Sequence, residues 1–181
     1  MFRGLKKNEL TLVRRGFDYW GAFPLVGELH LVVRQAVPAD PTEVCVVTPE
    51  VRYFVIGREP VPDAAGLPIG QVGKKAFNLT LEGAYLIAKA SDKKKVKVTG
   101  QAEALVLYGR DVFGTSITWA DESIAQNERV IIANKYGEAI GLGRARYGHD
   151  GLFADRVTVT TEADVGLYIR GQEPPGRSCR T

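Results

Sequence analysis

Two arginines stand at alternate positions late in the chain, in the segment IGLGRARYGHDG of residues 140–151. In an extended strand the side chains alternate between two faces, so Arg144 and Arg146 share one face and Gly141 and Gly143 share the other. Two rises of a strand would separate the guanidinium groups by about 7 Å. Guanidinium forks match phosphate oxygens and also stack on bases, while a glycine face lets another backbone approach closely. The pattern therefore indicates a strand that contacts RNA.

Tyr147 and His149 follow these arginines directly and could add stacking or hydrogen bonds. Arginines beside aromatic residues are typical of surfaces that bind single-stranded or irregular RNA. The alternative is that Arg144 and Arg146 only keep a solvated strand soluble and protect a sheet edge. The RNA interpretation depends on one condition. Both guanidinium groups must face solvent, without carboxylate partners from this chain and not covered by its first domain.

A run of lysines, Lys93, Lys94 and Lys95, precedes a new apolar pattern and is a second candidate for RNA contact. The run also indicates a boundary between two domains, and its alternative interpretation is a solvated linker. The chain has two histidines, which we interpret as structural or surface residues. Its two cysteines are far apart and form no CxxC or Cys/His cluster, so we expect no disulfide framework, no metal site and no cofactor.

Composition is that of an ordinary globular protein, with 45% hydrophobic and 25% charged residues among 181. The longest apolar runs are far shorter than the roughly 18–20 residues of a membrane span, and the beginning of the sequence does not read as a signal peptide, so we expect a cytoplasmic protein. Residues 1–95 hold 14 basic against 10 acidic residues, and residues 96–173 hold 8 against 11. This distribution excludes a uniformly basic coat, so any RNA contact must come from local clusters.

The hydrophobic periodicity differs between the two parts of the chain: helix and strand patterns before residue 95, and short strand patterns after it. Residues 6–20 have the spacing of an amphipathic helix, and three strand-like runs follow at 27–36, 42–49 and 51–57. A strand then passes into a helix capped by Thr80. After residue 95 come short strands separated by glycine turns, which is typical of a small barrel or sandwich, although residues 103–113 could instead hold its one short helix or turn.

Three later segments carry a family resemblance. VLYGRDVFGTSI (106–117) resembles the opening of a PUA domain, and GEAIGLGRA (137–145) resembles the paired strand that closes its core. VTVTTEADVGLYIRGQE (157–173) is similar to the end of the Nip-seven family of ribosome-biogenesis factors, a two-domain RNA-binding group of archaea and eukaryotes. Upstream, residues 73–98 resemble that family's passage into the PUA domain, and VRYFVI (51–56) resembles its N-terminal Tyr-rich strand.

The resemblance implies an α+β protein, with an N-terminal α/β domain containing an antiparallel sheet (1–95), a barrel-like PUA domain (96–173) and a mobile tail (174–181). The family binds RNA through basic residues in and after the glycine strand, which here match Arg144, Arg146 and, less closely, Arg156. The segment YGHDGLFAD that follows is less basic than in other members, which counts against strong electrostatic binding. PUA domains in general also approach RNA near the positions of Tyr108, Gly109 and Arg110.

We therefore expect a non-catalytic RNA-binding factor of ribosome assembly, with rRNA or pre-rRNA and other assembly factors as partners. One alternative is an RNA-modifying enzyme, or a subunit of one, of the pseudouridine synthase or transglycosylase type. Against it, 95 residues are too few for a catalytic domain of ordinary size, and Asp111 is interpreted as a turn residue. The other alternative is a protein-docking adaptor that uses the aromatic residues Phe17, Tyr19, Trp20 and Phe23, which would more often belong to a core.

Overall fold

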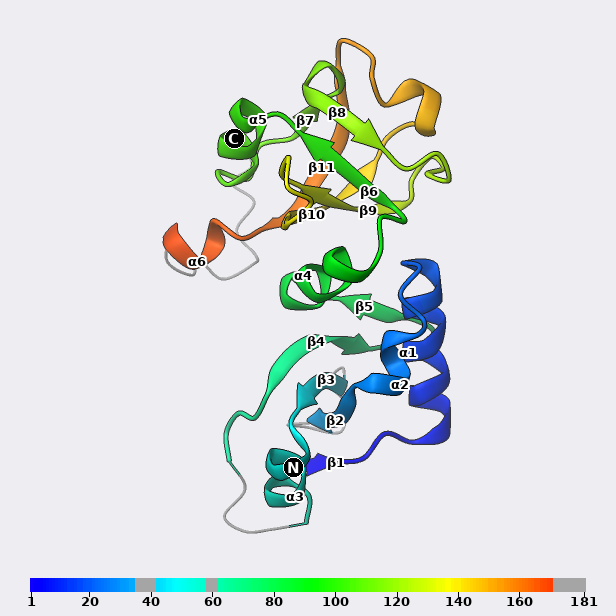
Figure 1. Cartoon of the computed structure of the whole chain (residues 1–181), viewed down its shortest axis with the longest axis vertical. Helices are drawn as coiled ribbons and strands as arrows, with labels where there is room; N and C mark the ends of the chain where they lie inside the picture. The colour runs from blue at the N-terminus through cyan, green and yellow to red at the C-terminus, as the bar shows by residue number, and fades with distance from the viewer. Residues whose placement is uncertain (35–41, 58–61, 171–181) are drawn as a thin grey trace, which may run out of the picture.

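The computed structural model describes residues 1–34, 42–57 and 62–170, and the expected tail at 174–181 lies outside them. The described chain forms two β-sheets, one in each half of an elongated molecule (Figure 1). One is an antiparallel sheet with helices beside it, and the other curls into a nearly closed barrel. The expected α+β class is therefore confirmed.

The first helix, α1 (Lys7–Tyr19), forms where helical periodicity predicted it. Its start is fixed by Glu9, whose carboxylate accepts a 2.7 Å hydrogen bond from the Lys6 backbone N–H. Val13 and Phe17 on its inner face are fully buried. The helix ends before Gly21, which has a φ of +70° that favours glycine.

The first sheet has five strands paired in chain order. They are β1 (Phe2–Arg3), β2 (His30–Arg34), β3 (Thr42–Val47), β4 (Leu67–Val72) and β5 (Phe77–Leu79). Every pair is antiparallel. A short helix, α2 (Leu25–Glu28), leads into the second strand.

One expected strand of this half is wrong, because residues 49–55 form helix α3 (Pro49–Val55) and not an extended run. The Thr48 hydroxyl accepts a hydrogen bond from the Val51 N–H at 3.3 Å, Pro49 occupies the first helical turn, and Glu50 lies near the positive end of the helix. These start signals outweigh the strand preference of VRYFVI. Only Ile56 makes a bridge to Phe2, outside the helix.

Helix α4 (Leu81–Ala90) links the two halves, and it begins as predicted. The Thr80 hydroxyl accepts from the Gly83 N–H at 3.3 Å. Gly83 also lets the helix lie directly on the sheet, since a Cβ there would stand 2.0 Å from the Ile69 carbonyl oxygen. The helix therefore packs against β4 on one side and against the second sheet on the other.

The second sheet has the strand order β7-β11-β10-β9-β6-β8. Its strands are β6 (Lys95–Val98), β7 (Val112–Phe113), β8 (Ile117–Ala120), β9 (Arg129–Ala133), β10 (Ala139–Ala145) and β11 (Val157–Asp164). Only β6 and β9 pair in parallel among these strands. Short helices are α5 (Gly100–Val106), which overlaps the start of the segment 103–113 considered for a helix or turn, and α6 (Leu167–Arg170). Single turns lie at η1 (Gly114–Ser116) and η2 (His149–Gly151).

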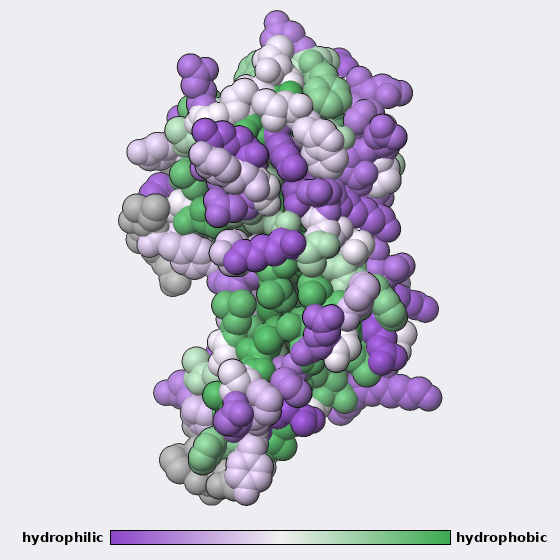
Figure 2. Space-filling model, in the orientation of Figure 1, coloured by the Kyte–Doolittle hydropathy of each residue, from purple (hydrophilic) through white to green (hydrophobic). Residues whose placement is uncertain are grey.

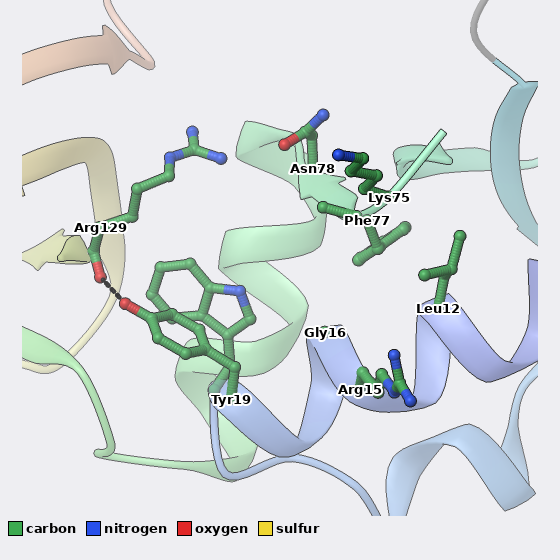
Figure 3. Close-up of a pocket in the computed structure, with 10 residues that line it drawn as sticks. Leu12, Arg15, Gly16, Tyr19, Lys75, Phe77, Asn78 and Arg129 are labelled. Carbon is green, nitrogen blue, oxygen red and sulfur yellow. Dashed lines mark hydrogen bonds between the residues drawn. The ribbon is translucent and has the colours of Figure 1, made fainter. Parts of the chain in front are cut away.

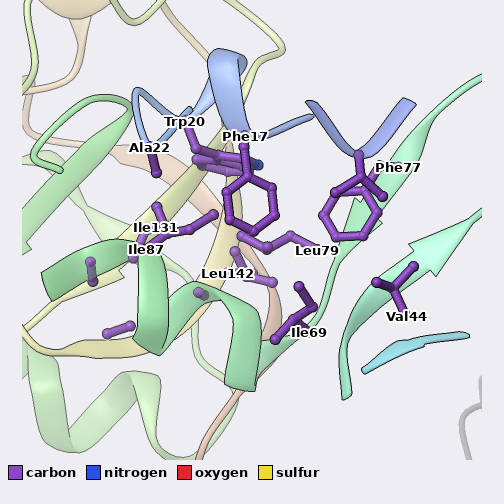
Figure 4. Close-up of a cluster of buried hydrophobic side chains, with 14 of the residues drawn as sticks. Phe17, Trp20, Ala22, Val44, Ile69, Phe77, Leu79, Ile87, Ile131 and Leu142 are labelled. Atoms are coloured by element: carbon purple, nitrogen blue, oxygen red, sulfur yellow. The ribbon is translucent and has the colours of Figure 1, made fainter. Parts of the chain in front are cut away.

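A hydrophobic core crosses from one half to the other. Figure 4 shows Ile131 of β9 and Leu142 of β10 lying with Phe17, Trp20 and Ile87 of the first half. The barrel interior holds a separate core. On the face shown in Figure 2, hydrophobic residues gather near the middle of the molecule and hydrophilic residues cover much of the barrel half. The shared core fixes the two sheets relative to one another.

Candidate nucleic-acid interface

The glycine strand has the two faces that its sequence predicted. A Cβ on Gly143 would stand 2.8 Å from the Val159 side chain and 3.0 Å from Ile132, both within the barrel. On the opposite face Leu142 is buried against the first half, whereas Arg144 and Arg146 are exposed. The glycines therefore allow close packing, while the arginines remain at the surface.

Strand pairing adds a third arginine to this surface. Arg144 lies opposite Arg129 of β9 and opposite Thr160 of β11. We call Arg129, Arg144 and Arg146 the arginine ladder. Sequence reasoning missed Arg129, because an irregularity between Ala139 and Gly141 shifts the β9–β10 register by one residue. A hairpin around Gly137 is visible in the sequence, but this shift is not.

One carboxylate holds two members of the ladder. Glu162 of β11 accepts from Arg129 Nε at 2.9 Å with one oxygen and from Arg144 Nε at 2.8 Å with the other. Arg144 also donates from Nη1 to the Asn127 carbonyl oxygen at 2.8 Å. The positions of both guanidinium groups are therefore set by the strands beneath them.

Arg146 is held from a different strand edge. Its Nε donates to the Thr160 hydroxyl at 2.8 Å, and its Nη2 donates to Asp111 at 2.9 Å. Asp111 also accepts from the Thr161 N–H at 3.0 Å. The residue interpreted as a simple turn former is thus an ion-pair partner of the ladder.

These contacts violate the condition set for the RNA interpretation, because both arginines have carboxylate partners from this chain. What is left is a weaker form of that interpretation, in which phosphate must compete with those carboxylates. Neither arginine lies beneath the first half, since their side chains remain 46% and 45% exposed. Within the described residues Nη2 of Arg144, Nη1 of Arg146 and both terminal nitrogens of Arg129 make no hydrogen bond. Three guanidinium groups against two carboxylates leave one net positive charge. A phosphate could reach the unused donors, but only in competition with Glu162 and Asp111.

Arg156 and Tyr147 face each other in the connection after β10. The guanidinium carbon of Arg156 lies 3.9 Å from the centroid of the Tyr147 ring. This contact occupies one face of the ring, so any base could stack only on the other face. Tyr147 lies next to Arg146 in the chain, but among the described residues no hydrogen bond or ion pair joins the side chains of Tyr147 and Arg156 to the ladder.

Tyr108, Gly109 and Arg110 form the turn after α5. Gly109 has a φ of +72°, and the Tyr108 side chain is 72% exposed. The Arg110 carbonyl accepts a 2.8 Å hydrogen bond from the Thr161 hydroxyl, next to the bond between Asp111 and Thr161. Through these bonds the turn is anchored to the middle of β11, next to Thr160, which holds Arg146.

The lysine run does not form a solvated linker. Lys95 is only 1% exposed, and its ammonium group donates to the Ala88 carbonyl and to Asp92, both at 2.8 Å. Lys94 is 6% exposed and pairs with Glu128. Only Lys93 is exposed, and it donates to the Asp18 carbonyl near the end of α1. Burial takes Lys94 and Lys95 out of reach of RNA and makes them part of the joint between the two halves.

Other titratable groups in the described residues serve the fold. Cys45 is a buried free thiol, and burial together with nearby Glu43 raises its pKa to about 12. His149 contacts the Asp121 carbonyl through Nδ1 at 3.2 Å and its ring meets Phe153 edge-on. Across residues 1–34, 42–57 and 62–170 no group of three or more His, Cys, Asp or Glu side chains is placed to hold a metal ion. In the same ranges no helix combines the length and apolar character that a membrane crossing requires.

The aromatic residues considered for protein docking divide between core and surface. Phe17 and Trp20 are buried in the shared core. Tyr19 is half-buried, and its hydroxyl donates to the Arg129 carbonyl at 2.8 Å. Phe23 is 50% exposed. Two of the four are therefore core residues and Tyr19 is held against the second half, so the four do not form a common docking surface.

The fold and its sequence define a PUA-domain protein. Residues 94–173 match the UPF0113 PUA domain family. A UPF0113 protein of Archaeoglobus fulgidus is 34% identical over 175 residues, which cover 95% of this chain and 96% of that relative. The chain therefore belongs to the UPF0113 family.

Two solved structures share the fold across both halves. A conserved PUA domain protein from Thermoplasma acidophilum superposes with a TM-score of 0.64 at 17% identity, over 92% of this chain and 95% of that one. A hypothetical protein from Pyrococcus horikoshii gives a TM-score of 0.64 at 16% identity, over 91% and 94%. These likenesses concern the fold alone.

Proposed function

We propose that this protein is a non-catalytic RNA-binding factor of ribosome assembly and that it contacts RNA through the arginine ladder. The observation that carries the proposal is the cluster of three guanidinium groups from Arg129 on β9, Arg144 on β10 and Arg146 just beyond the end of β10, with acceptors on the neighbouring β11. Hydrogen bonds fix their positions, and each guanidinium group keeps unused N–H donors at the surface. Arginine forks held in this way suit the oxygens of a phosphate backbone.

The ion pairs determine the kind of binding to expect. Glu162 and Asp111 hold the guanidinium groups in place before RNA arrives, which reduces the side-chain entropy lost on binding. They also compete with phosphate and leave the ladder with little net charge. We therefore expect moderate affinity that depends on salt, and preference for single strands whose bases remain accessible.

The ribosomal role rests on the resemblance to the Nip-seven family, carried by residues 106–117, 137–145 and 157–173. The match to the UPF0113 PUA domain family, over residues 94–173, contains all three segments and supports the PUA part of this resemblance. We propose rRNA or pre-rRNA as the ligand and other assembly factors as protein partners. Crosslinking of bound RNA in cell extracts, followed by sequencing, tests this: reads spread evenly over cellular RNA would contradict the ribosomal role.

Filter binding with U-rich single-stranded RNA at several salt concentrations tests the ladder. We expect the double variant Arg144→Ala plus Arg146→Ala to bind more weakly, and the slope of log K against log salt to fall by about 1.4, or about 0.7 for each lost contact. The matched control removes two exposed cations of the first half, Lys7→Ala plus Arg52→Ala. If both double variants bind as the unchanged protein does, or if the unchanged protein binds only in the millimolar range at low salt, the ladder is not the RNA site.

A further inference from the structure

A groove of about 310 Å³ lies where the two halves meet, between α1, the turn into β5 and the start of β9 (Figure 3). Small-molecule sites have volumes of roughly 300–1,000 Å³, so this groove has room for one nucleotide. Its lining comes from three elements that are far apart in sequence: Leu12, Arg15, Gly16, Tyr19, Trp20, Lys75, Ala76, Phe77, Asn78 and Arg129.

The groove is built rigidly. Gly16 lets α1 lie directly against β5, since a Cβ there would stand 2.6 Å from the Phe77 ring. Tyr19 closes the other end by donating from its hydroxyl to the Arg129 carbonyl, and its ring meets Trp20 edge-on at 4.9 Å. Apolar side chains, Leu12 and Phe77 among them, form much of the lining. The geometry therefore exists before any ligand binds.

The charge of the lining has one sign. Arg15, Lys75 and Arg129 are cations, and the described residues of the lining include no carboxylate. Arg15 and Lys75 are exposed, and no hydrogen bond or ion pair joins either side chain to the described part of the chain. Cations around an apolar lining suit a ligand that joins a flat apolar group to an anion.

Arg129 makes the groove continuous with the arginine ladder. Its backbone oxygen is held by Tyr19 within the groove lining, while its Nε shares Glu162 with Arg144. A polyanion on the ladder would therefore meet the groove without crossing an intervening strand. An acidic peptide could use the cations, but an unpaired nucleotide uses both the cations and the apolar lining.

We propose that this groove binds an unpaired nucleotide of the same RNA strand that lies on the arginine ladder, with its phosphate on Arg15, Lys75 and Arg129 and its base in the apolar part of the groove. This inference rests on the proposed RNA-binding function and extends the RNA site to the N-terminal half. It gives that half a direct role in RNA contact, which sequence reasoning assigned only to the lysine run.

The two tryptophans allow a local measurement. Trp119 lies on β8 and is 39% exposed, whereas Trp20 lines the groove. In a Trp119→Phe variant, Trp20 is the only tryptophan of the chain. We expect its emission to change on titration with a U-rich RNA of about 12 nucleotides, within the site sizes known for single-strand binders. The change should saturate at the same RNA concentrations as filter binding.

Removing the groove cations should affect both signals. In the Arg15→Ala plus Lys75→Ala variant we expect the Trp20 response to be lost, RNA affinity to fall roughly tenfold, and the salt slope to fall by about 1.4. The matched control, Lys7→Ala plus Lys74→Ala, removes two exposed cations outside the lining and should keep the response. Free UMP and poly-glutamate serve as further probes.

The possible outcomes distinguish failure of the groove proposal from failure of the proposed RNA-binding function. If RNA binds and the ladder variant weakens it, but the groove variant behaves like its control, the groove proposal is wrong and the ladder stands. If UMP or poly-glutamate changes Trp20 emission and the RNA does not, the groove takes another ligand and the proposal is equally wrong. If no RNA binds the unchanged protein, the proposed function fails first.

Discussion

At the scale of single residues, Glu162 is the group that we expect to limit RNA binding most at the proposed site. Its two oxygens are shared between Arg129 and Arg144, so it both orients these cations and offsets their charge. Positioning and competition are opposite effects of one side chain. Because exposed ion pairs contribute only about 0–1 kcal/mol, Glu162 holds the arginines weakly. Its negative charge also repels an incoming phosphate, so we expect the charge of Glu162 to have the larger effect on RNA affinity.

We therefore predict that Glu162→Gln tightens binding of U-rich RNA by about threefold, since the amide keeps a hydrogen-bond acceptor but removes the charge. Filter binding at low salt measures this. Glu122→Gln removes an exposed carboxylate outside the ladder and serves as the control. Weaker binding by Glu162→Gln would mean that the orientation of the arginines matters more than their net charge.

At the scale of elements, helices α1 and α4 could be predicted because their signals are local: apolar spacing in one and the Thr80 cap in the other. Helix α3 could not, since Thr48 and Pro49 compete with a segment of high strand preference. Other features depend on tertiary packing and could not be predicted from the local sequence. Asp92 lies only three residues before Lys95, but nothing in the run of lysines shows that packing will bury Lys94 and Lys95 and leave Lys93 exposed.

The same limit applies to the candidate site. The alternation of Arg144 and Arg146 placed both on one surface, but Glu162, which lies on another strand, could not be assigned to them from sequence. Arg129 depends on a register shift, and the groove depends on contact between α1 and β9. The local sequence pattern therefore predicts the part of the site on β10. The contributions of β9 and β11 depend on long-range strand pairing.

The joint between α4 and β6 carries a prediction for acid stability. The hydrogen bond from Lys95 lowers the pKa of Asp92 below its ordinary value. A lowered carboxylate pKa stabilises the fold at pH values above the unfolded-state pKa of about 3.9, and this stabilisation is lost as the pH falls through the folded-state pKa. Urea unfolding should show Asp92→Asn less stable than the unchanged protein at pH 7, and the difference should shrink at about pH 3. The exposed Asp63→Asn control should have the same free energy of unfolding as the unchanged protein at both pH values. If the Asp92→Asn variant were less stable by the same amount at pH 7 and at about pH 3, the prediction would be contradicted.

At the scale of the whole molecule, the shared core should couple the unfolding of the two halves. Leu142 of β10 is 1% exposed and packs in the cluster that contains Phe17 and Ile87. A connection through surface contacts alone would let the halves unfold separately. A hydrophobic core that contains residues of both halves makes the unfolding of one half destabilise the other.

We predict a single cooperative unfolding transition, in which tryptophan emission and far-UV circular dichroism coincide. Leu142→Ala should lower the free energy of unfolding by about 2–5 kcal/mol and keep one transition, because the cavity would lie in the common core. Leu105→Ala, at a side chain that is 54% exposed, is the control and should have little effect. Two separate transitions in the unchanged protein would show that the halves are independent.

The hydrogen bond from Tyr19 to the Arg129 carbonyl has a consequence for how RNA could be selected. It ties the helix that borders the groove to the strand that carries the first arginine of the ladder, so the distance between the two ends of the surface is set before RNA arrives. The protein then acts as a fixed template, and most of the ordering on binding falls on the nucleotide chain. RNA strands whose phosphates already have the matching spacing would then bind with the highest affinity. A greater charge on the RNA alone would not give the same advantage.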